Sequence, residues 1–547
     1  MVIKVSVLVS YFLLVLGIGW INRTRWKSTP ESYFLASRQL RTVILLATMA
    51  ATNFSAFTMF GTSGAGYRDG YAFFPIMGFG TGFMALSFWV IGRKIRQMGQ
   101  QYQLVTPPEL VKTLYQSPRL SMLFAVVMIV FTIPYLALQP MAAGYVLEEL
   151  VGLPYFVGCL LVTGIIMLYT LRGGLRAVVW TDLFQGVLML ALLIVSLFLV
   201  ANHFGGFVAA NEKAWSLYPE LFSRPGGSGK YTIGIWFSFL MLWFFCDPMF
   251  PQLFQRFYAA RDNRAIGKTM CLYPLVCTVI FFIPISIGVM GHLAFPDLAG
   301  KDADKILPML LTIISGDAMA ALVMAAGIAA LMSTMDSQLL TLSSIFTYDI
   351  LPLLSTSVSK STSSLPGRIA VLILSMAGLA LAYKPPATIL QIAAQTFTGL
   401  AVLFPTVFFG LYLQKRFATA AIASILAGEG MLILFYLKLI PSGPFLPVVW
   451  VLLVAVFFYL AIHFYLVKQS GIFRLSTPAW LRNRYIWLFM LLFVLAHDVW
   501  SWKTAQPLVL GVPYWIGYFV LLSLGQIILM YFLVKRGSLK EYDNDLL

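Results

Sequence analysis

The sequence predicts an all-α polytopic membrane protein whose core consists of two inverted five-helix repeats. Hydrophobic residues make up 60% of the chain and charged residues 11%, a balance typical of proteins solvated by lipid. Windows of about 20 apolar residues, long enough to cross a bilayer as helices, follow one another along the chain. Two of them, at the start of two successive halves, contain residues that interrupt a helix, as in transporters with inverted repeats.

Fifteen such windows can be marked, and they predict about 15 transmembrane helices. They are 4–22, 43–67, 71–92, 121–148, 154–171, 178–203, 232–256, 270–295, 317–350, 367–383, 387–413, 417–438, 445–467, 484–501 and 512–534. The first is expected to stay in the protein, because a basic cluster follows it and no small-residue cleavage site does.

The basic residues predict the orientation of these helices. With the N-terminus outside and the C-terminus inside, most of the 37 lysine and arginine residues lie in inner loops, and Arg256 at the end of the seventh window is counted with them. A basic inner rim facing anionic lipid also accounts for the net charge of +16 without nucleic acid.

The second window contains "ATMAATNFSAFTMFGTSGAGYRDG", residues 47–70. Thr52, Asn53 and Ser55 lie close together near its middle. The helix is either unwound here, which frees carbonyl groups for an ion or a solute, or its small residues pack closely against a neighbouring helix.

The sixth window begins near "RGGLRAVVWTDLFQGVLM", residues 172–189, and places Asp182 and Gln185 a few turns inside the membrane. Charged groups at such depth are costly and usually face a cavity or a partner. Asp182 serves either a cation exit route or a structural hydrogen bond to a neighbouring helix.

The seventh window contains "WFFCDPMFPQLFQRF", residues 243–257. Pro248 and Pro251 predict a break or strong kink, because proline removes a backbone donor and clashes with the preceding turn. Asp247 is either a substrate or proton group or a cap of the second half-helix. Windows two to six and seven to eleven therefore form two halves that each begin with an interrupted helix.

The ninth window contains "AALMSTMDSQLLTLSS", residues 329–344. Ala330, Ser333, Thr334 and Ser337 share one stripe of a helix. Their oxygen atoms suit sodium, a hard cation, and Asp336 could add charge for a second cation or a proton. The alternative is that the hydroxyl groups bond back to their own helix.

Several stretches resemble the sodium/solute symporter family. They are "ESYFLASRQL", "GGLRAVVWTDLFQGVLM", "RFYAARDNRAIGK" and "GIAALMSTMDSQLLTLSSIFTYDI", and the similarity runs from about residue 4 to residue 467. The resemblance implies the leucine-transporter-like fold, with the core in windows two to eleven and alternating access around a site in mid-membrane.

The resemblance also implies where sodium binds. The implied ligands are the carbonyls of Ala51, Phe54 and Ala330 and the hydroxyls of Ser333 and Thr334. In members with a second sodium, the positions of Asp182, Ser333, Asp336 and Ser337 contribute. Asp336 replaces a serine of some such members, and the number and kind of coupled ions stay open between sodium and proton.

Substrate contacts are expected from the broken helices and the helices that face them. The residues chosen are Thr52, Asn53, Tyr135, Gln139, Trp243, Gln395 and Thr396. Gln395 stands where related sugar carriers have a substrate-binding glutamine. "TIPYLALQPMAAGYVLEEL" and "YKPPATI" resemble the monocarboxylate and pantothenate branches, so a small carboxylate such as pyruvate, lactate or acetate is the predicted solute.

The chain divides into five predicted parts. They are the first helix and inner loop (1–42), the first repeat with an outer loop (43–231), the second repeat (232–413), two peripheral helices with an inner loop (414–483), and an extra two-helix segment with an acidic tail (484–547). The last part resembles short membrane proteins that accompany some of these symporters.

The predicted function is sodium-coupled import of a small solute across the inner (plasma) membrane by a protein that is not an enzyme. The four cysteines and four histidines have no metal or redox spacing, and "GGSGK" at 226–230 lacks the setting of a phosphate loop. The alternatives are a proton-coupled symporter, a pantothenate or amino-acid symporter, and a transporter-like solute sensor. The sequence does not predict an oligomeric state.

Overall fold

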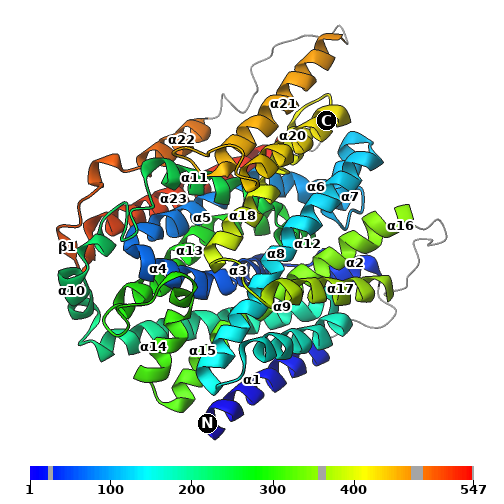
Figure 1. Ribbon diagram of the computed structural model, residues 1–547. Helices are drawn as coiled ribbons and strands as arrows, with labels where there is room; N and C mark the ends of the chain where they lie inside the picture. Colours follow the sequence, from blue (N-terminus) through cyan, green and yellow to red (C-terminus); the bar gives the residue numbers. More distant parts are fainter. Residues whose placement is uncertain (23–28, 355–364, 470–483, 545–547) are drawn as a thin grey trace.

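The computed structural model describes residues 1–22, 29–354, 365–469 and 484–544, which form a bundle of helices (Figure 1). The predicted inner-loop stretches 23–28, 355–364 and 470–483 and the end of the acidic tail lie outside the described residues. Short 3-10 and π segments carry the label η.

The first part of the bundle contains α1 (Val2–Ile21), α2 (Pro30–Leu35), η1 (Ala36–Arg38), α3 (Thr42–Asn53), η2 (Phe57–Gly61), α4 (Thr62–Asp69), η3 (Gly70–Phe73), η4 (Ile76–Gly80), α5 (Thr81–Met84), η5 (Phe88–Gly92), α6 (Arg93–Gln101), α7 (Pro107–Tyr115), α8 (Pro118–Val151), α9 (Tyr155–His203), α10 (Phe207–Leu217) and η6 (Pro219–Phe222). The second part contains α11 (Ile233–Cys246), η7 (Asp247–Met249), α12 (Pro251–Ala259), α13 (Asn263–Gly291), η8 (Gly300–Lys305), α14 (Ile306–Ile314), α15 (Asp317–Ile345), η9 (Phe346–Ile350), α16 (Leu351–Leu354), α17 (Leu365–Ala382), α18 (Ile389–Ala401) and α19 (Phe404–Tyr412). The C-terminal part contains α20 (Ala418–Tyr436), α21 (Pro447–Gln469), α22 (Arg484–Leu495), η11 (Val499–Ser501), the antiparallel pair β1 (Leu508–Val509) and β2 (Val512–Pro513), and α23 (Tyr514–Asn544).

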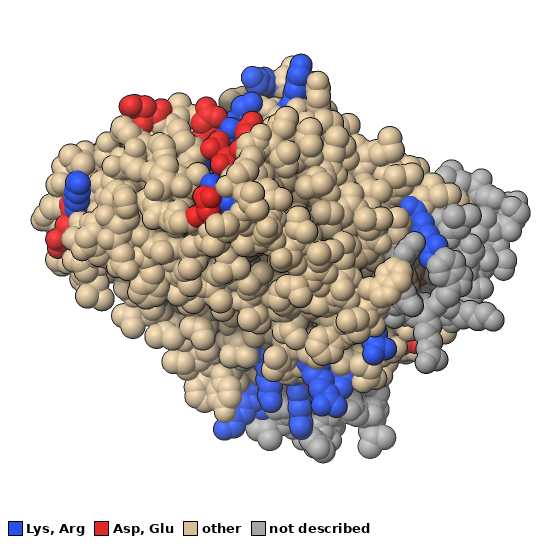
Figure 2. All heavy atoms as spheres, turned by 90° about the horizontal axis from the view of Figure 1, so that it is seen from below, with Lys and Arg blue, Asp and Glu red and all other residues tan. Residues whose placement is uncertain are grey.

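The apolar helices follow the hydropathy of the sequence. Among the described residues, 11 helices are long and apolar enough to cross a membrane, or up to 13 if each of two bent pairs is one span. Every predicted window overlaps one of these helices, a bent pair, or one of two shorter apolar helices, Tyr155–Leu171 and Pro366–Ala382. The face drawn in Figure 2 has a wide band without charged residues between charged groups at its edges, as a lipid-facing surface requires.

Both predicted breaks are present. The axis bends by 63° between α3 and the helix that begins at Phe57, and by 54° between α11 with η7 and α12. In the first break Phe54 is extended, with ψ of 92°, and in the second Phe250 is extended, with ψ of 124°. Pro248 and Pro251 explain the second break, because neither can continue the hydrogen bonds of a helix. The first break has no proline.

Helix α15 lies in the interior of the bundle. It packs against α1, α3, α8, α9 and α17, and every residue from Val323 to Ile345 is buried. The many polar side chains of this stretch therefore face protein rather than lipid, which is where polar groups in a membrane protein can find partners. α3 and α12 also contact α15, so both breaks lie beside its polar stripe.

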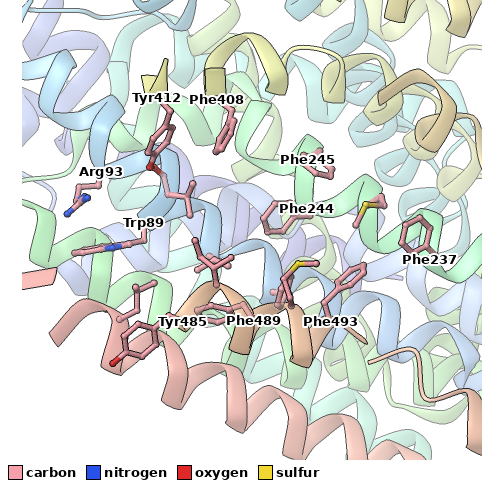
Figure 3. A pocket seen from close by; sticks show the side chains of 17 residues that line it. Trp89, Arg93, Phe237, Phe244, Phe245, Phe408, Tyr412, Tyr485, Phe489 and Phe493 are labelled. Atoms are coloured by element: carbon pink, nitrogen blue, oxygen red, sulfur yellow. The ribbon is translucent and has the colours of Figure 1, made fainter. Parts of the chain in front are cut away.

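The C-terminal helix α23 packs against α13, α5 and η4, and α22 packs against α23. A groove of about 650 Å³ separates part of α22 from η5, α11 and α19 (Figure 3). Aromatic rings of the core and of α22 point into it, among them Phe244, Phe408, Phe489 and Phe493. The groove contains none of the candidate cation or solute residues.

Candidate cation and solute site

The two broken helices meet at the centre of the bundle. The Asn53 side chain, at the end of α3, places its Nδ2 3.5 Å from Oδ2 of Asp247, at the end of α11. The same Nδ2 donates to the Tyr273 hydroxyl on α13 at 2.8 Å. Asn53 and Asp247 are 8% and 2% exposed. The two interruptions therefore lie close to each other, and the Asp247 carboxylate lies beside Asn53.

The expected sodium ligands are brought together beside the break in α3. Oγ of Ser333 lies 2.8 Å from the carbonyl oxygen of Ala51 and 3.0 Å from that of Ala330. Oγ1 of Thr334 lies 3.0 Å from the carbonyl of Thr52 and 3.2 Å from that of Ala330. Each hydroxyl thus bonds back to its own helix and also reaches across to α3. The result is a buried group of neutral oxygen atoms, the ligand type that hard cations prefer.

Two further residues belong to the surroundings of this oxygen cluster. Phe54 is fully buried directly after the end of α3, with its ring 5.9 Å from that of Tyr273. The Thr52 carbonyl was not among the predicted ligands, since the sequence pointed to its side chain. Only the position of Thr334, on a different helix, identifies this carbonyl as part of the cluster.

The residues of the expected second cation site surround an arginine. Nη2 of Arg256 lies 3.2 Å from Oδ2 of Asp182, 2.7 Å from Oγ of Ser337 and 3.0 Å from Oγ1 of Thr52. The Thr48 hydroxyl donates to the same Asp182 oxygen at 2.5 Å. Arg256 and Asp182 are both fully buried. The inclusion of Arg256 among the inner-loop basic residues was wrong, because α12 carries its guanidinium into the protein interior.

Asp336 lies next to this ion pair but is bonded differently. Its Oδ2 accepts a hydrogen bond from the Tyr169 hydroxyl at 2.9 Å, and the residue is fully buried. It interacts electrostatically with both Asp182 and Arg256. Arg256 thus forms an ion pair with Asp182, whereas Asp336 has the Tyr169 hydroxyl as its hydrogen-bond partner. A buried charge needs such a compensating partner.

Two of the seven expected substrate residues, Tyr135 and Trp243, belong to a buried aromatic cluster beside the breaks. The ring of Tyr135 lies 4.9 Å from that of Phe397 and 5.2 Å from that of Phe250, and Trp243 lies 5.4 Å from Phe397. The Tyr135 hydroxyl is 3.3 Å from Oγ of Ser55. The sequence did not single out Phe250 or Phe397, because a ring in an apolar window looks like ordinary core.

Among the other expected substrate residues, Gln139 and Thr396 are buried, whereas Gln395 is exposed. The Gln139 Oε1 accepts a hydrogen bond from the backbone N–H of Ala56 at 3.1 Å, which ties α8 to the break after α3. Thr396 is 2% exposed. Gln395, its neighbour on α18, is exposed, unlike the other six candidate residues.

Asp247 does not cap the second half of the broken helix. The residue before α12 is Phe250, and neither η7 nor α12 has a side-chain cap at its N-terminus. The backbone of Asp247 instead continues α11 with φ of −54° and ψ of −44°. Of the two alternatives for this carboxylate, capping is therefore wrong.

Polar contacts join separate elements at both ends of the bundle. At the predicted outer end, Arg68 on α4 pairs with Asp304 in η8 at 2.9 Å, and Asp304 also accepts from the N–H of Ile389 at 3.0 Å. Burial raises the pKa of Asp304, and the nearby Arg68 guanidinium opposes this rise. At the predicted inner end, Arg38 donates to the Leu104 carbonyl at 2.9 Å.

The sequence model of the sodium:solute symporter family matches residues 33–428. The Sodium/pantothenate symporter of Escherichia coli (strain K12) is 28% identical over 434 residues, which cover 77% of this chain and 88% of that protein. The High-affinity proline transporter of Bacillus subtilis (strain 168) is 25% identical over 430 residues, covering 77% of this chain and 89% of that protein.

Solved structures show the same fold. A Na+-coupled sialic acid symporter in a substrate-bound outward-open state superimposes with a TM-score of 0.70 at 17% identity, covering 87% of this chain and 99% of that chain. Mhp1, a nucleobase-cation-symport-1 family transporter in a closed conformation, gives 0.55 at 13% identity, covering 83% and 98%. The fold is therefore the leucine-transporter-like fold that the sequence predicts.

Proposed function

The chain belongs to the sodium:solute symporter family, and on this basis we propose that it imports a small organic solute with a carboxylate group, driven by sodium. Members of this family are transporters rather than enzymes. We place the protein in the plasma (inner) membrane, where an inward sodium gradient can drive alternating access to the buried site.

The oxygen cluster beside the break in α3 is the single observation that carries this proposal. Oγ of Ser333 lies within 3.2 Å of the carbonyl oxygens of Ala51 and Ala330, and Oγ1 of Thr334 lies within 3.2 Å of the carbonyl oxygen of Ala330. Phe54, in the break itself, completes the proposed ligand set. All are neutral, so the site favours sodium without a permanent counter-charge, and the ion can leave when the inner end opens.

One sodium ion for each solute is the stoichiometry that the geometry favours. Arg256 already places a positive charge between Asp182 and Ser337, where a second sodium ion would bind. A cation beside a guanidinium at this depth would face strong like-charge repulsion. We therefore propose coupling through the Ser333 and Thr334 site alone.

The solute is proposed to bind between the breaks, against Tyr135, Gln139, Trp243 and Thr396, with Asn53 at the end of α3. The relatives named above carry pantothenate and proline, and each of these solutes has a carboxylate. The N-terminal end of α12 faces the second break and supplies the positive end of a helix dipole for such a group. The exposed Gln395 is left out of this set.

The test is uptake into proteoliposomes of a radiolabelled panel containing pyruvate, lactate, acetate, pantothenate, proline and glucose. The wild type should accumulate one carboxylate solute only with an inward sodium gradient, and Ser333→Ala/Thr334→Ala should abolish the sodium effect. Uptake driven by a proton gradient without sodium would replace this proposal with proton coupling. Binding of a solute without any flux would indicate a sensor.

A further inference from the structure

Asp247 is a buried carboxylate that forms no ion pair with any of the described residues. It is 2% exposed, its Oδ2 faces the Asn53 amide, and its Oδ1 has no hydrogen-bond partner in the described part of the chain. The ionisable groups that interact with it, Tyr135, Tyr273, Cys246 and Cys277, are all neutral at physiological pH. An ionised carboxylate in such surroundings is costly unless something pairs with it.

Three of the other buried aspartates pair with an arginine, whereas Asp336, which is also fully buried, accepts a hydrogen bond from the Tyr169 hydroxyl. Asp182, Asp304 and Asp498 are each at most 1% exposed, and each lies 2.7 to 3.2 Å from an arginine nitrogen. Among the described residues, Asp247 forms no ion pair, and its side chain accepts from the Asn53 amide near the hydroxyls of Tyr135 and Tyr273 and the thiols of Cys246 and Cys277. It also lies at the C-terminal end of α11, where the helix dipole is negative and a second negative charge is disfavoured. The position therefore calls for a cation that is not part of the protein.

A complementary group lies one turn earlier on the same helix. Trp243 is 2% exposed, and its indole Nε1, which can only donate, has no hydrogen-bond partner among the described residues. Residues four apart share one face of a helix, with their Cβ atoms about 5 to 6 Å apart. Trp243 and Asp247 thus present one free donor and one free acceptor beside the rings of Tyr135 and Phe397.

We propose that the solute is zwitterionic, with a protonated amine that pairs with Asp247 and a carboxylate that accepts from Trp243 Nε1. The aromatic rings then cover its apolar part and stabilise the ammonium group by cation–π attraction. This inference rests on the proposed function and narrows its substrate class. Simple anions such as lactate would leave Asp247 unpaired and add a second negative charge, so they are rejected.

Matched pairs of solutes test this proposal in proteoliposomes with an inward sodium gradient. Each pair exchanges an amine for a hydroxyl or an ether oxygen: L-alanine with L-lactate, L-valine with 2-hydroxyisovalerate, and L-proline with tetrahydrofuran-2-carboxylate. We expect the transported amine to be preferred over its partner by at least about 100-fold. The reason is that the partner solute would leave the Asp247 charge buried without a counter-charge, which costs free energy. This comparison needs only the wild type.

Asp247→Asn and Trp243→Phe add the residue-level test. Asp247→Asn should lower amine uptake by at least about 100-fold and remove the preference over the hydroxy acid, while thermal stabilisation by sodium remains. Trp243→Phe should lower the uptake of both solutes of a matched pair by the same factor. Retained sodium stabilisation shows that each variant is folded.

The outcomes separate this inference from the function on which it rests. Sodium-driven uptake of lactate, acetate or pantothenate that is unchanged by Asp247→Asn overturns the zwitterion and leaves the sodium symporter intact. Amine uptake that does not depend on sodium overturns the proposed coupling and leaves the recognition by Asp247 intact.

Discussion

At the scale of single residues, Arg256 determines the charge balance of the interior. Its guanidinium bridges Asp182 on α9 and Ser337 on α15 and also lies 3.0 Å from Oγ1 of Thr52 on α3. Side chains of three helices therefore contact one cation, which α12 carries. Burying both members of an ion pair is costly by itself, so such a pair is often retained for specificity rather than for stability.

Arg256→Gln is expected to destabilise the protein by about 3–5 kcal/mol, because it leaves the Asp182 carboxylate buried without a cation. The measurement is the apparent melting temperature in detergent. The control is Arg256→Gln/Asp182→Asn, which removes both charges and should recover most of the loss. If the double variant is no more stable than Arg256→Gln, Arg256 acts through its neutral hydrogen bonds instead.

Ser333→Ala is expected to raise the sodium concentration for half-maximal uptake about 10- to 100-fold, because one oxygen ligand to a cation contributes about 1.5–3 kcal/mol. The maximal rate at saturating sodium should change less. Ser343→Ala is the matched control on α15, since among the described residues that hydroxyl donates within its own helix, to the Leu340 carbonyl at 2.8 Å. Equal sodium responses of the two variants would exclude Ser333 from the sodium site.

At the scale of elements, the ion pair between Arg68 and Asp304 joins α4 to η8 at the predicted outer end. Asp304→Asn removes the ion pair with Arg68 and should increase opening of this end, seen as amide hydrogen exchange about tenfold faster in 62–69 and 300–305. Asp302→Asn is the control, because Asp302 is exposed two residues away. Unchanged exchange in Asp304→Asn would mean that packing alone closes this end.

The extra helices α22 and α23 are fixed to the core by a second buried ion pair. Nη2 of Arg224, in the loop before α11, lies 2.7 Å from Oδ2 of Asp498, and the guanidinium lies 4.8 Å from the centre of the Trp515 ring. Asp498 has a φ of 42° and ψ of 44°, a left-handed conformation that asparagine also tolerates. Asp498→Asn therefore removes the charge without straining the backbone.

This substitution is expected to cost about 3–5 kcal/mol of stability, because Arg224 then stays buried without its partner. The readout is the midpoint of thermal unfolding, with sodium-driven uptake at low temperature nearly unchanged. Arg224→Leu/Asp498→Asn should regain part of the midpoint. A large loss of uptake with an unchanged midpoint would instead assign these helices a direct part in transport.

At the scale of the whole molecule, hydropathy located each helix of the described residues that is long and apolar enough to cross a membrane, because a bilayer demands about 20 apolar residues for each crossing. The two breaks were also predictable, the second from Pro248 and Pro251 and the first from small and polar residues around Asn53. The stripe of Ser333 and Thr334 followed from helical spacing, and the structure places it beside the break in α3 as expected.

The remaining features depend on contacts between residues far apart in the sequence. Arg256 looked like an inner-loop residue because it ends an apolar window, and only the tilt of α12 after the break brings it to Asp182, 74 residues earlier. The exposure of Gln395 and the positions of the Phe250 and Phe397 rings likewise depend on how α18 and α12 pack. No periodicity in one helix encodes these pairings.

The most direct test of the account is the parallel measurement of radiolabelled sodium and solute entering proteoliposomes made with the wild type. One sodium ion should enter with each solute molecule, and both fluxes should fall together in Ser333→Ala/Thr334→Ala. Solute entry without sodium entry, or two sodium ions for each solute, would contradict a single sodium site with Arg256 in place of the second ion.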